Sequence, residues 1–530
     1  MSTHIIHCSN NYISLSKNRF LDIPITKDYS KICSFLQNDL NINCSIDKDI
    51  IISYSQDWSN IPGYANLLAR PNSEKQCGQI LFLCYANKIP ITISAGKTNL
   101  TGSATPNGGI VLSTENMRTP HIELDKSQQE IISPIGIPLE QLRDKILLLS
   151  NNMLHFPVDP TSRHDAFVGG ILACNASGFI PGEKGATRYW AKGIKFVLPN
   201  GYHLTATRGE HISKNGEFIL QCDNKAIKIP IPTYERPKIK NASGPFSAPN
   251  GELDFIDFII GSEGIYGMIT SCVLTVTKKP KNHLEFFIRL KNEDSAIKLH
   301  QFLYDYFKSD LSKISALEYF GYNCQNYMKH KEFFFNNKNQ VGVYLQIPIY
   351  EEIGQDKIAE WVEIFTSFNS DMNMDDIIVL NDPIIWNKFF ESRHSIPDNA
   401  LRKSKELGGI SFITDTIVPF SNFKKYLNLV HKKIRSSKIE YLLFGHLGDC
   451  HLHFHLIPNE KQQKISNEIY NYMIDLSAKL GGVYSAEHGT GKRKRIDFLK
   501  CYGEDAYDMI SKAKKSLDPH FILNKGNVIN

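Results

Sequence analysis

At 530 residues the chain is too long for one compact domain, and its 42% hydrophobic and 22% charged residues are typical of globular proteins. This composition excludes a disordered or fibrous protein. The 60 basic and 55 acidic residues leave a net charge of only +5, which argues against a dedicated nucleic-acid binder, because such proteins usually gather basic residues on one face.

The eleven cysteines are scattered, and none forms a C-x-x-C pair. This spacing excludes the usual iron–sulfur and zinc-ribbon patterns and favours reduced thiols in a cytosolic compartment. The first residues lack the apolar core of a signal peptide, and no apolar run is long enough to span a membrane. We therefore expect a cytoplasmic protein, with peripheral attachment to the inner membrane as an alternative.

Residues 1–280 alternate short β-branched runs with helical stretches and glycine turns, which indicates an α/β or α+β domain. Residues 1–69 show little recognisable sequence pattern, and we expect them to form the beginning of this domain. The expected strands include 91–93, 109–112, 194–198 and 272–276, and a helix is expected over 75–87.

Three stretches of this region suit a ligand. A loop with Gly96 follows the strand at 91–93, and its backbone N–H groups could bind a pyrophosphate, although a plain surface turn fits as well. Small residues crowd 169–178, where either a flat ring or a close helix would fill the space. Three glycines interrupt the apolar run 258–270, which suits backbone contacts to a ligand or a tight turn.

Together with Arg70-Pro71 and the turn 159–162, these stretches resemble the FAD-binding domain of the vanillyl-alcohol-oxidase-like, or p-cresol-methylhydroxylase (PCMH)-type, flavoproteins. The resemblance implies a two-subdomain PCMH-type FAD-binding domain over 1–280. No Gly-His pair stands in the first loop, so we expect non-covalent FAD. The residues expected to bind it are Pro71, Ala95, Gly96, Lys97, Thr98, Asn99, Gly102, Pro160, Thr161, Ser162, Gly169, Gly170, Ala173, Asn175, Ser177, Gly178, Gly261, Glu263, Gly264, Gly267, Ile269 and Asn524.

Residues 281–480 have the pattern of a second domain. A strand at 284–290 is followed by amphipathic helices and by another strand at 441–445, which indicates an antiparallel sheet covered by helices. Residues 481–530 are expected to pack back onto the FAD-binding domain. The fold class predicted for the whole chain is α+β, with 281–480 as a cap domain for the substrate.

Four histidines stand within ten residues, at 446, 451, 453 and 455. Alternate residues of a strand share a face, so His451, His453 and His455 would point the same way. With Glu487 in a later glycine-rich segment, this grouping favours a divalent metal site over an ordinary polar strand face.

The segments 445–453 and 486–491 resemble the C-terminal signature of FAD-linked 2-hydroxy-acid dehydrogenases, which include D-lactate dehydrogenases of the cytochrome or quinone type. The resemblance implies that His446, His453 and Glu487 bind a divalent metal (zinc, manganese or iron). It also implies that His488 is the general base and that Arg393 grips the substrate carboxylate. The family usually has Gly-Asn where this chain has Cys450-His451, which leaves a change of metal preference open.

The same resemblance implies oxidation of a small D-2-hydroxy acid, with electrons passed to an external quinone, cytochrome or electron-transfer flavoprotein. Ile413 stands where D-2-hydroxyglutarate dehydrogenases have a lysine, which favours D-lactate over D-2-hydroxyglutarate or glycolate. Two other readings are a non-redox enzyme like alkyl-dihydroxyacetonephosphate synthase and a non-catalytic flavin subunit. The metal, base and arginine set argues against both. No nucleic-acid partner is expected, and a homodimer stays open.

Overall fold

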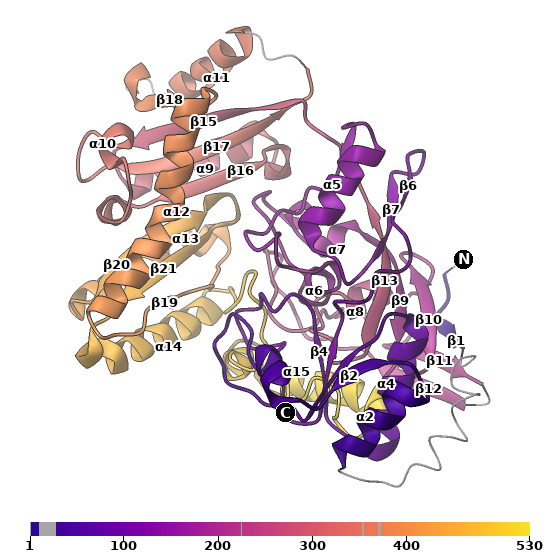
Figure 1. The fold of residues 1–530 in the computed structure, drawn as a ribbon. Helices are drawn as coiled ribbons and strands as arrows, with labels where there is room; N and C mark the ends of the chain where they lie inside the picture. The colour runs from indigo at the N-terminus through magenta and orange to yellow at the C-terminus, as the bar shows by residue number, and fades with distance from the viewer. Residues whose placement is uncertain (1, 10–27, 224, 352–354, 369–372) are drawn as a thin grey trace.

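Two lobes make up the computed structural model, which describes residues 2–9, 28–223, 225–351, 355–368 and 373–530 (Figure 1). The N-terminal lobe carries the FAD-type motifs, and the second lobe, called the cap below, begins after residue 280. Part of the segment 1–69, namely residues 1 and 10–27, lies outside the described residues.

The first sheet of the N-terminal lobe has parallel strands at its centre, so that the loops after them meet at one edge. Helix α4 (Glu74–Asn87) joins two of these strands and is capped by the Ser73 hydroxyl, which accepts the backbone N–H of Gln76. The strand order is β2 (Asn43–Ser45), β3 (Leu67–Arg70), β5 (Ile110–Ser113) and β4 (Ile91–Ser94), with β3 and β4 parallel to β5.

The second sheet of this lobe is antiparallel and five-stranded. Its order is β10 (His203–Thr207), β9 (Ala191–Val197), β13 (Met268–Thr275), β7 (Glu130–Pro134) and β6 (Glu123–Asp125). Two small sheets join β1 (Ile5–Cys8) to β11 (Glu217–Cys222) and β12 (Lys225–Pro230), and β14 (Thr277–Lys278) to β8 (Leu154–His155). The other helices are α2 (Tyr29–Asn38), α3 (Lys48–Ile51), α5 (Leu139–Leu149), α6 (Val168–Cys174), α7 (Thr187–Trp190) and α8 (Phe255–Ile259).

The cap contains a seven-stranded antiparallel sheet, as the sequence predicts. Its order is β18 (Ile377–Val379), β15 (Asn282–Leu290), β17 (Val341–Ile349), β16 (Ala316–Phe320), β20 (Glu440–His446), β21 (His451–Ile457) and β19 (Phe412–Ile413). Its helices are α9 (Glu293–Tyr306), α10 (Lys331–Phe334), α11 (Gln355–Phe368), α12 (Pro383–Glu406), α13 (Phe420–Ser436) and α14 (Gln463–Lys479).

The two faces of the cap sheet pack against different helices, because side chains alternate along each strand. Leu317 and Val343 pack with α9, α11, α13 and α14 in one core. Phe320 and Tyr344 point the other way and pack with Phe389 of α12 in a second core. The polar residues of the site lie on this second face.

The C-terminal helix α15 (Arg495–Leu517) returns to the N-terminal lobe, where it is drawn in yellow in Figure 1 and packs against β12. Its apolar residues, such as Ile510 and Leu517, belong to the same core as β4. Beyond the helix, Leu523 forms a bridge with Ile91. The end of the chain therefore completes the core that its first half begins.

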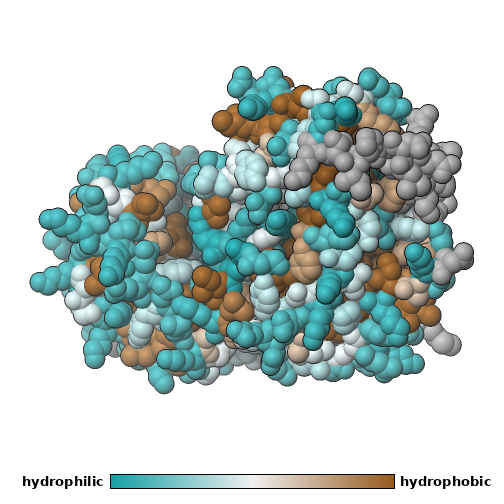
Figure 2. All heavy atoms as spheres, turned by 90° about the horizontal axis from the view of Figure 1, so that it is seen from below, coloured by the Kyte–Doolittle hydropathy of each residue, from teal (hydrophilic) through white to brown (hydrophobic). Residues whose placement is uncertain are grey.

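Among the described residues, no helix combines the length and the apolar character that crossing a bilayer requires. The face shown in Figure 2 is mainly hydrophilic, with apolar residues in small groups.

Candidate functional site

A cavity in the N-terminal lobe is lined by all three of the stretches that the sequence singles out. The expected FAD-binding residues on its wall are Ala95, Gly96, Lys97, Thr98, Asn99, Pro160, Thr161, Ser162, Gly169, Gly170, Ala173, Ser177, Gly178, Glu263, Gly264, Gly267, Ile269 and Asn524. The wall also includes Leu100 of the first loop, and Trp58, Ser103 and Phe179, which no motif marked in the sequence.

Four of the expected residues do not line this cavity: Pro71, Gly102, Asn175 and Gly261. Asn175 ends α6 in the left-handed conformation (φ 50°), and its side-chain oxygen accepts the backbone N–H of Arg188 at 2.8 Å. Gly102 and Gly261 also have positive φ angles, of 86° and 78°. These residues shape the backbone behind the wall.

The wall has the features that an FAD molecule needs. Lys97 adopts a left-handed conformation (φ 58°), as residues of an anion-binding backbone nest do. Gly96 packs so closely on the chain that a Cβ there would lie 1.9 Å from the carbonyl oxygen of Asp165. A Cβ at Gly170 would meet only the Ala95 methyl within 4 Å, at 3.3 Å, so the space beside Gly170 is free for a flat ring. The residues present fit FAD.

Glu263 lines the cavity, but its carboxylate already has partners. It accepts the backbone N–H groups of Thr490 and Gly491, both at 2.7 Å, and the hydroxyl of Ser103. Burial raises the pKa of Glu263, while these donors oppose the rise. Glu263 therefore ties the C-terminal segment to the cofactor loops.

The register of the cap sheet explains how the histidines meet. Glu318 pairs with His446, and His446 pairs with His451, so the three side chains form a row across β16, β20 and β21. His453 follows on the same face of β21. Glu487 closes the group: its Oε1 lies 3.2 Å from His446 Nε2, 3.4 Å from His453 Nε2 and 3.8 Å from His451 Nδ1.

These four side chains have the donor chemistry of a divalent metal site, with ligand atoms all within 4.8 Å of one another. His446 Nδ1 hydrogen-bonds Glu318 at 2.6 Å, and His453 Nδ1 donates to the Thr414 carbonyl at 2.8 Å. In each ring the contact leaves Nε2 free to bind a metal. It also fixes the orientation of the ring, as outer-shell partners of metal ligands do. The expected ligand set, His446, His453 and Glu487, thus converges on one point, and the residues fit a metal.

Glu318 joins this group to Arg393 and was not marked by any sequence motif. Its Oε2 accepts from Arg393 Nη2 at 3.1 Å, while its Oε1 faces His446. Burial would raise the pKa of Glu318, but His446 and Arg393 outweigh it and hold the value at about 2. The Arg393 guanidinium also lies over the Phe179 ring, 4.7 Å from its centre. Arg393 of α12 is therefore next to both the histidine cluster and the cavity wall.

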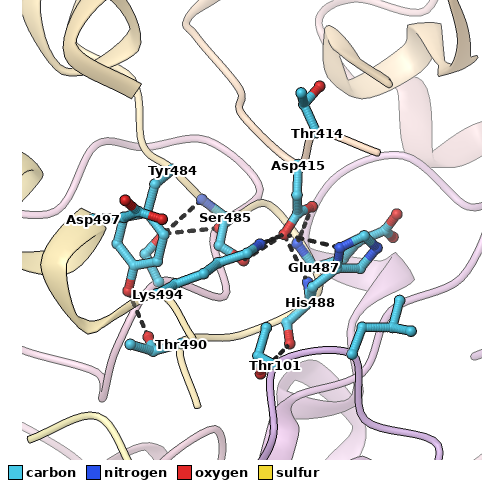
Figure 3. Close-up of polar contacts among 12 residues, drawn as sticks. Thr101, Thr414, Asp415, Tyr484, Ser485, Glu487, His488, Thr490, Lys494 and Asp497 are labelled. Carbon is cyan, nitrogen blue, oxygen red and sulfur yellow. Dashed lines mark hydrogen bonds and ion pairs between the residues drawn. The ribbon is translucent and has the colours of Figure 1, made fainter. Parts of the chain in front are cut away.

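His488 reaches the cofactor cavity from a network centred on Asp415 (Figure 3). Asp415 accepts the backbone N–H of His488 at 3.0 Å, Lys494 Nζ at 2.8 Å and the Ser485 hydroxyl at 2.5 Å. Its Oδ2 also lies 3.5 Å from His488 Nδ1. Burial lowers the pKa of His488 to about 4 against the opposing charge of Asp415. The imidazole is therefore neutral near pH 7.

Lys240 is a second participant without a sequence signal. Only 3% of its side chain is exposed, and its ammonium lies 3.3 Å from Asp449 and 3.4 Å from Glu487. Burial disfavours the charge, but Glu487 and Asp449 outweigh it and raise the pKa of Lys240. Its positive charge offsets part of the negative charge near Glu487.

Both halves of the site match known protein families. Residues 65–207 match the model described as FAD binding domain, and residues 325–528 match the C-terminal domain of FAD linked oxidases. Two of the three cofactor loops, 95–102 and 159–178, lie in the first match, and the histidine cluster lies in the second. The third loop, 261–269, falls between the two matches.

Relatives extend over almost the whole chain. A D-lactate dehydrogenase of Anaerostipes hadrus is 24% identical over 91% of this chain and 94% of its own length. A D-2-hydroxyglutarate–pyruvate transhydrogenase of Saccharomyces cerevisiae is also 24% identical, over 97% of this chain and 96% of its own.

Solved structures share the fold at lower identity. A 4-ethylphenol oxidase from Gulosibacter chungangensis superposes with a TM-score of 0.67 at 14% identity, over 96% of this chain and 98% of the other. A p-cresol methylhydroxylase gives 0.63 at 14% identity, with 98% of both chains covered. The PCMH-type α+β fold expected from the sequence is confirmed.

Proposed function

We propose that this chain, which belongs to the FAD-linked oxidases, oxidises a small D-2-hydroxy acid to the 2-oxo acid. The proposed substrate is D-lactate. The observation that carries the proposal is one shared cavity. The loops that fit FAD and the side chains of His446, Glu487 and His488 line the same space. A hydroxy acid held there would have its reacting carbon between the flavin site and a base.

The choice of D-lactate rests on relatives and on one side chain. Several relatives are named D-lactate dehydrogenase, from bacterial, archaeal and plant sources. Ile413, at the end of β19, offers no cation for the second carboxylate of a diacid such as 2-hydroxyglutarate. A monocarboxylate therefore suits the site better.

In the proposed reaction, Arg393 binds the substrate carboxylate, and His446, His453 and Glu487 would hold a divalent metal. When bound, the metal would acidify the 2-hydroxyl, and FAD would take the hydride from C2. His488, whose imidazole is uncharged near pH 7, removes the hydroxyl proton as the general base. Asp415 positions His488 through its backbone N–H.

The two electrons that leave the substrate would need an external acceptor. Some relatives carry the word cytochrome in their names, and another is named for transfer to pyruvate. We therefore propose a quinone, a cytochrome or an electron-transfer flavoprotein, and add a 2-oxo acid to the acceptors to be tested. The proposed location is the cytoplasm, with attachment to the inner membrane if the acceptor is a quinone.

We propose a separate role for each of three parts of the chain. Residues 1–280 form the FAD-binding domain, 281–480 the cap that carries Arg393 and the histidines, and 481–530 the segment that brings Glu487 and His488 to the cofactor lobe. Light scattering on the purified chain would give its molecular mass in solution and so show whether it forms a homodimer.

The test is anaerobic reduction of the flavin in the purified full-length chain. D-lactate, L-lactate, glycolate and D-2-hydroxyglutarate are added separately, with and without prior chelation, while the flavin absorbance is recorded. We expect metal-dependent bleaching by D-lactate and little by the others. A yellow protein that no hydroxy acid bleaches would refute the dehydrogenase proposal and favour a non-redox flavoenzyme or a subunit that needs a partner.

A further inference from the structure

We propose that His451 is a fourth protein ligand of the metal, so that the site holds three imidazoles and one carboxylate. This inference deepens the proposed function, on which it rests for the presence of the metal. It concerns a residue at which this chain departs from the Gly-Asn pattern of the family.

Distances place His451 among the ligands. Two atoms that bind one zinc-like ion at about 2.1 Å and at a tetrahedral angle are about 3.4 Å apart. Glu487 Oε1 is 3.2 Å from His446 Nε2 and 3.4 Å from His453 Nε2, and His451 Nδ1 is only slightly farther away, at 3.8 Å. A small rotation of one ring would equalise the three distances.

The His451 ring needs a partner that the protein does not supply. The side chain is fully buried. Nε2 lies 3.1 Å from Asp415 Oδ1, an oxygen that also accepts the Glu487 backbone N–H, whereas Nδ1 makes no hydrogen bond among the described residues. A buried polar group left in this state is costly, and a metal at Nδ1 would satisfy it.

The arrangement around His451 would then be that of the other two histidines. His446 and His453 each present one nitrogen to Glu487 and direct the other at a carboxylate or carbonyl. His451 would present Nδ1 and keep Nε2–H toward Asp415. A ligand and an outer-shell acceptor on opposite sides of an imidazole are the usual pattern at metal sites.

His455 provides a matched control on the same strand. Its side chain is also fully buried, and within the part of the chain that the structure describes both of its ring nitrogens lack hydrogen bonds. It pairs across the sheet with Leu442 and Ile413 and is not part of the group whose ligand atoms converge. Replacing His455 with asparagine thus changes burial and polarity on β21 as His451→Asn does, without touching the proposed ligands.

A third imidazole has a consequence for metal choice. Imidazole nitrogen suits zinc, iron, nickel and copper, whereas carboxylate and water oxygen suit manganese and magnesium. We therefore expect the wild-type chain to select zinc over manganese more strongly than the His451→Asn variant does.

The test uses the full-length flavoprotein loaded with zinc. X-ray absorption at the zinc edge counts the imidazoles of the wild-type site, and chelator competition gives the zinc dissociation constants of wild type, His451→Asn and His455→Asn. Loss of an outer-shell partner already costs about 10- to 100-fold in metal affinity, so loss of a direct ligand should cost roughly tenfold or more. We expect three imidazoles in the wild type and this weakening in His451→Asn only.

Two imidazoles in the wild type, or equal zinc affinities for the two variants, would overturn the inference. The wild-type measurement keeps the inference testable even if His451→Asn folds poorly. Flavin bleaching is recorded on the same samples. A chain with two imidazoles that D-lactate still bleaches would refute the role of His451 alone, whereas a three-imidazole site that is never bleached would refute the proposed function alone.

Discussion

Replacement of Asp415 by asparagine should destabilise the protein strongly, because this carboxylate balances a buried cation. Asp415 is 2% exposed and Lys494 is 6% exposed, with 2.8 Å between their charged atoms. An asparagine keeps the shape but turns an N–H₂ group toward some of the donors that now meet carboxylate oxygens. Breaking one side of a buried ion pair typically costs about 3–5 kcal/mol, because the other charge stays buried without a partner. Such a loss is a large part of a total stability of about 5–15 kcal/mol.

The assay is chemical denaturation of the flavin-bound protein, followed by flavin and tryptophan fluorescence. The decisive comparison adds Lys494→Met to Asp415→Asn, since removing the stranded cation should recover most of the lost stability. Turnover should not recover, because Asp415 also receives the backbone N–H of His488. A loss below about 1 kcal/mol in the single variant, or no rescue in the double variant, would refute the argument from the buried charge pair.

Three further variants test other parts of the site. Glu318→Gln should weaken metal binding about 10- to 100-fold, since it alters the partner of His446 Nδ1, and unchanged metal affinity by chelator competition would contradict this. Gly170→Leu should fold but purify without flavin, because the leucine side chain would enter the open space beside Ala95. The control variant Gly170→Ala should keep its flavin and its yellow colour. Equal flavin content in the two proteins would show that the flavin ring does not occupy this space. His488→Ala should retain FAD and lose about 10²- to 10⁴-fold in turnover with D-lactate, the usual contribution of a general base, and full activity would exclude that role.

The sequence locates most of the cavity wall, because its loops consist of backbone and small residues at fixed local spacings. Gly170 and Gly178 can be found in this way, since no long-range contact is needed to recognise them. The same reasoning does not separate wall residues from those behind the wall. Asn175 belongs to the same motif, but its left-handed backbone turns its side chain toward Arg188.

The residues that the sequence does not reveal are those brought in by sheet register and long connections. Glu318 stands 128 positions from His446 in sequence, and only the pairing of β16 with β20 places them side by side. Lys240 comes from the N-terminal lobe and contacts Asp449 of the cap and Glu487 of the C-terminal segment. Neither lies in a local motif, so only the three-dimensional arrangement identifies them.

The return of the chain end to the N-terminal lobe makes the cap an insertion rather than an appended domain. A fragment cut at residue 280 would lose α15 and the Leu523 partner of Ile91, and so would expose the core that they cover. It would also lose Thr490 and Gly491, which satisfy the buried Glu263 carboxylate. A chimaera that carries the cap of a relative should therefore have two junctions, near residues 281 and 480. The rest of the N-terminal lobe, including α15, should be kept from one parent.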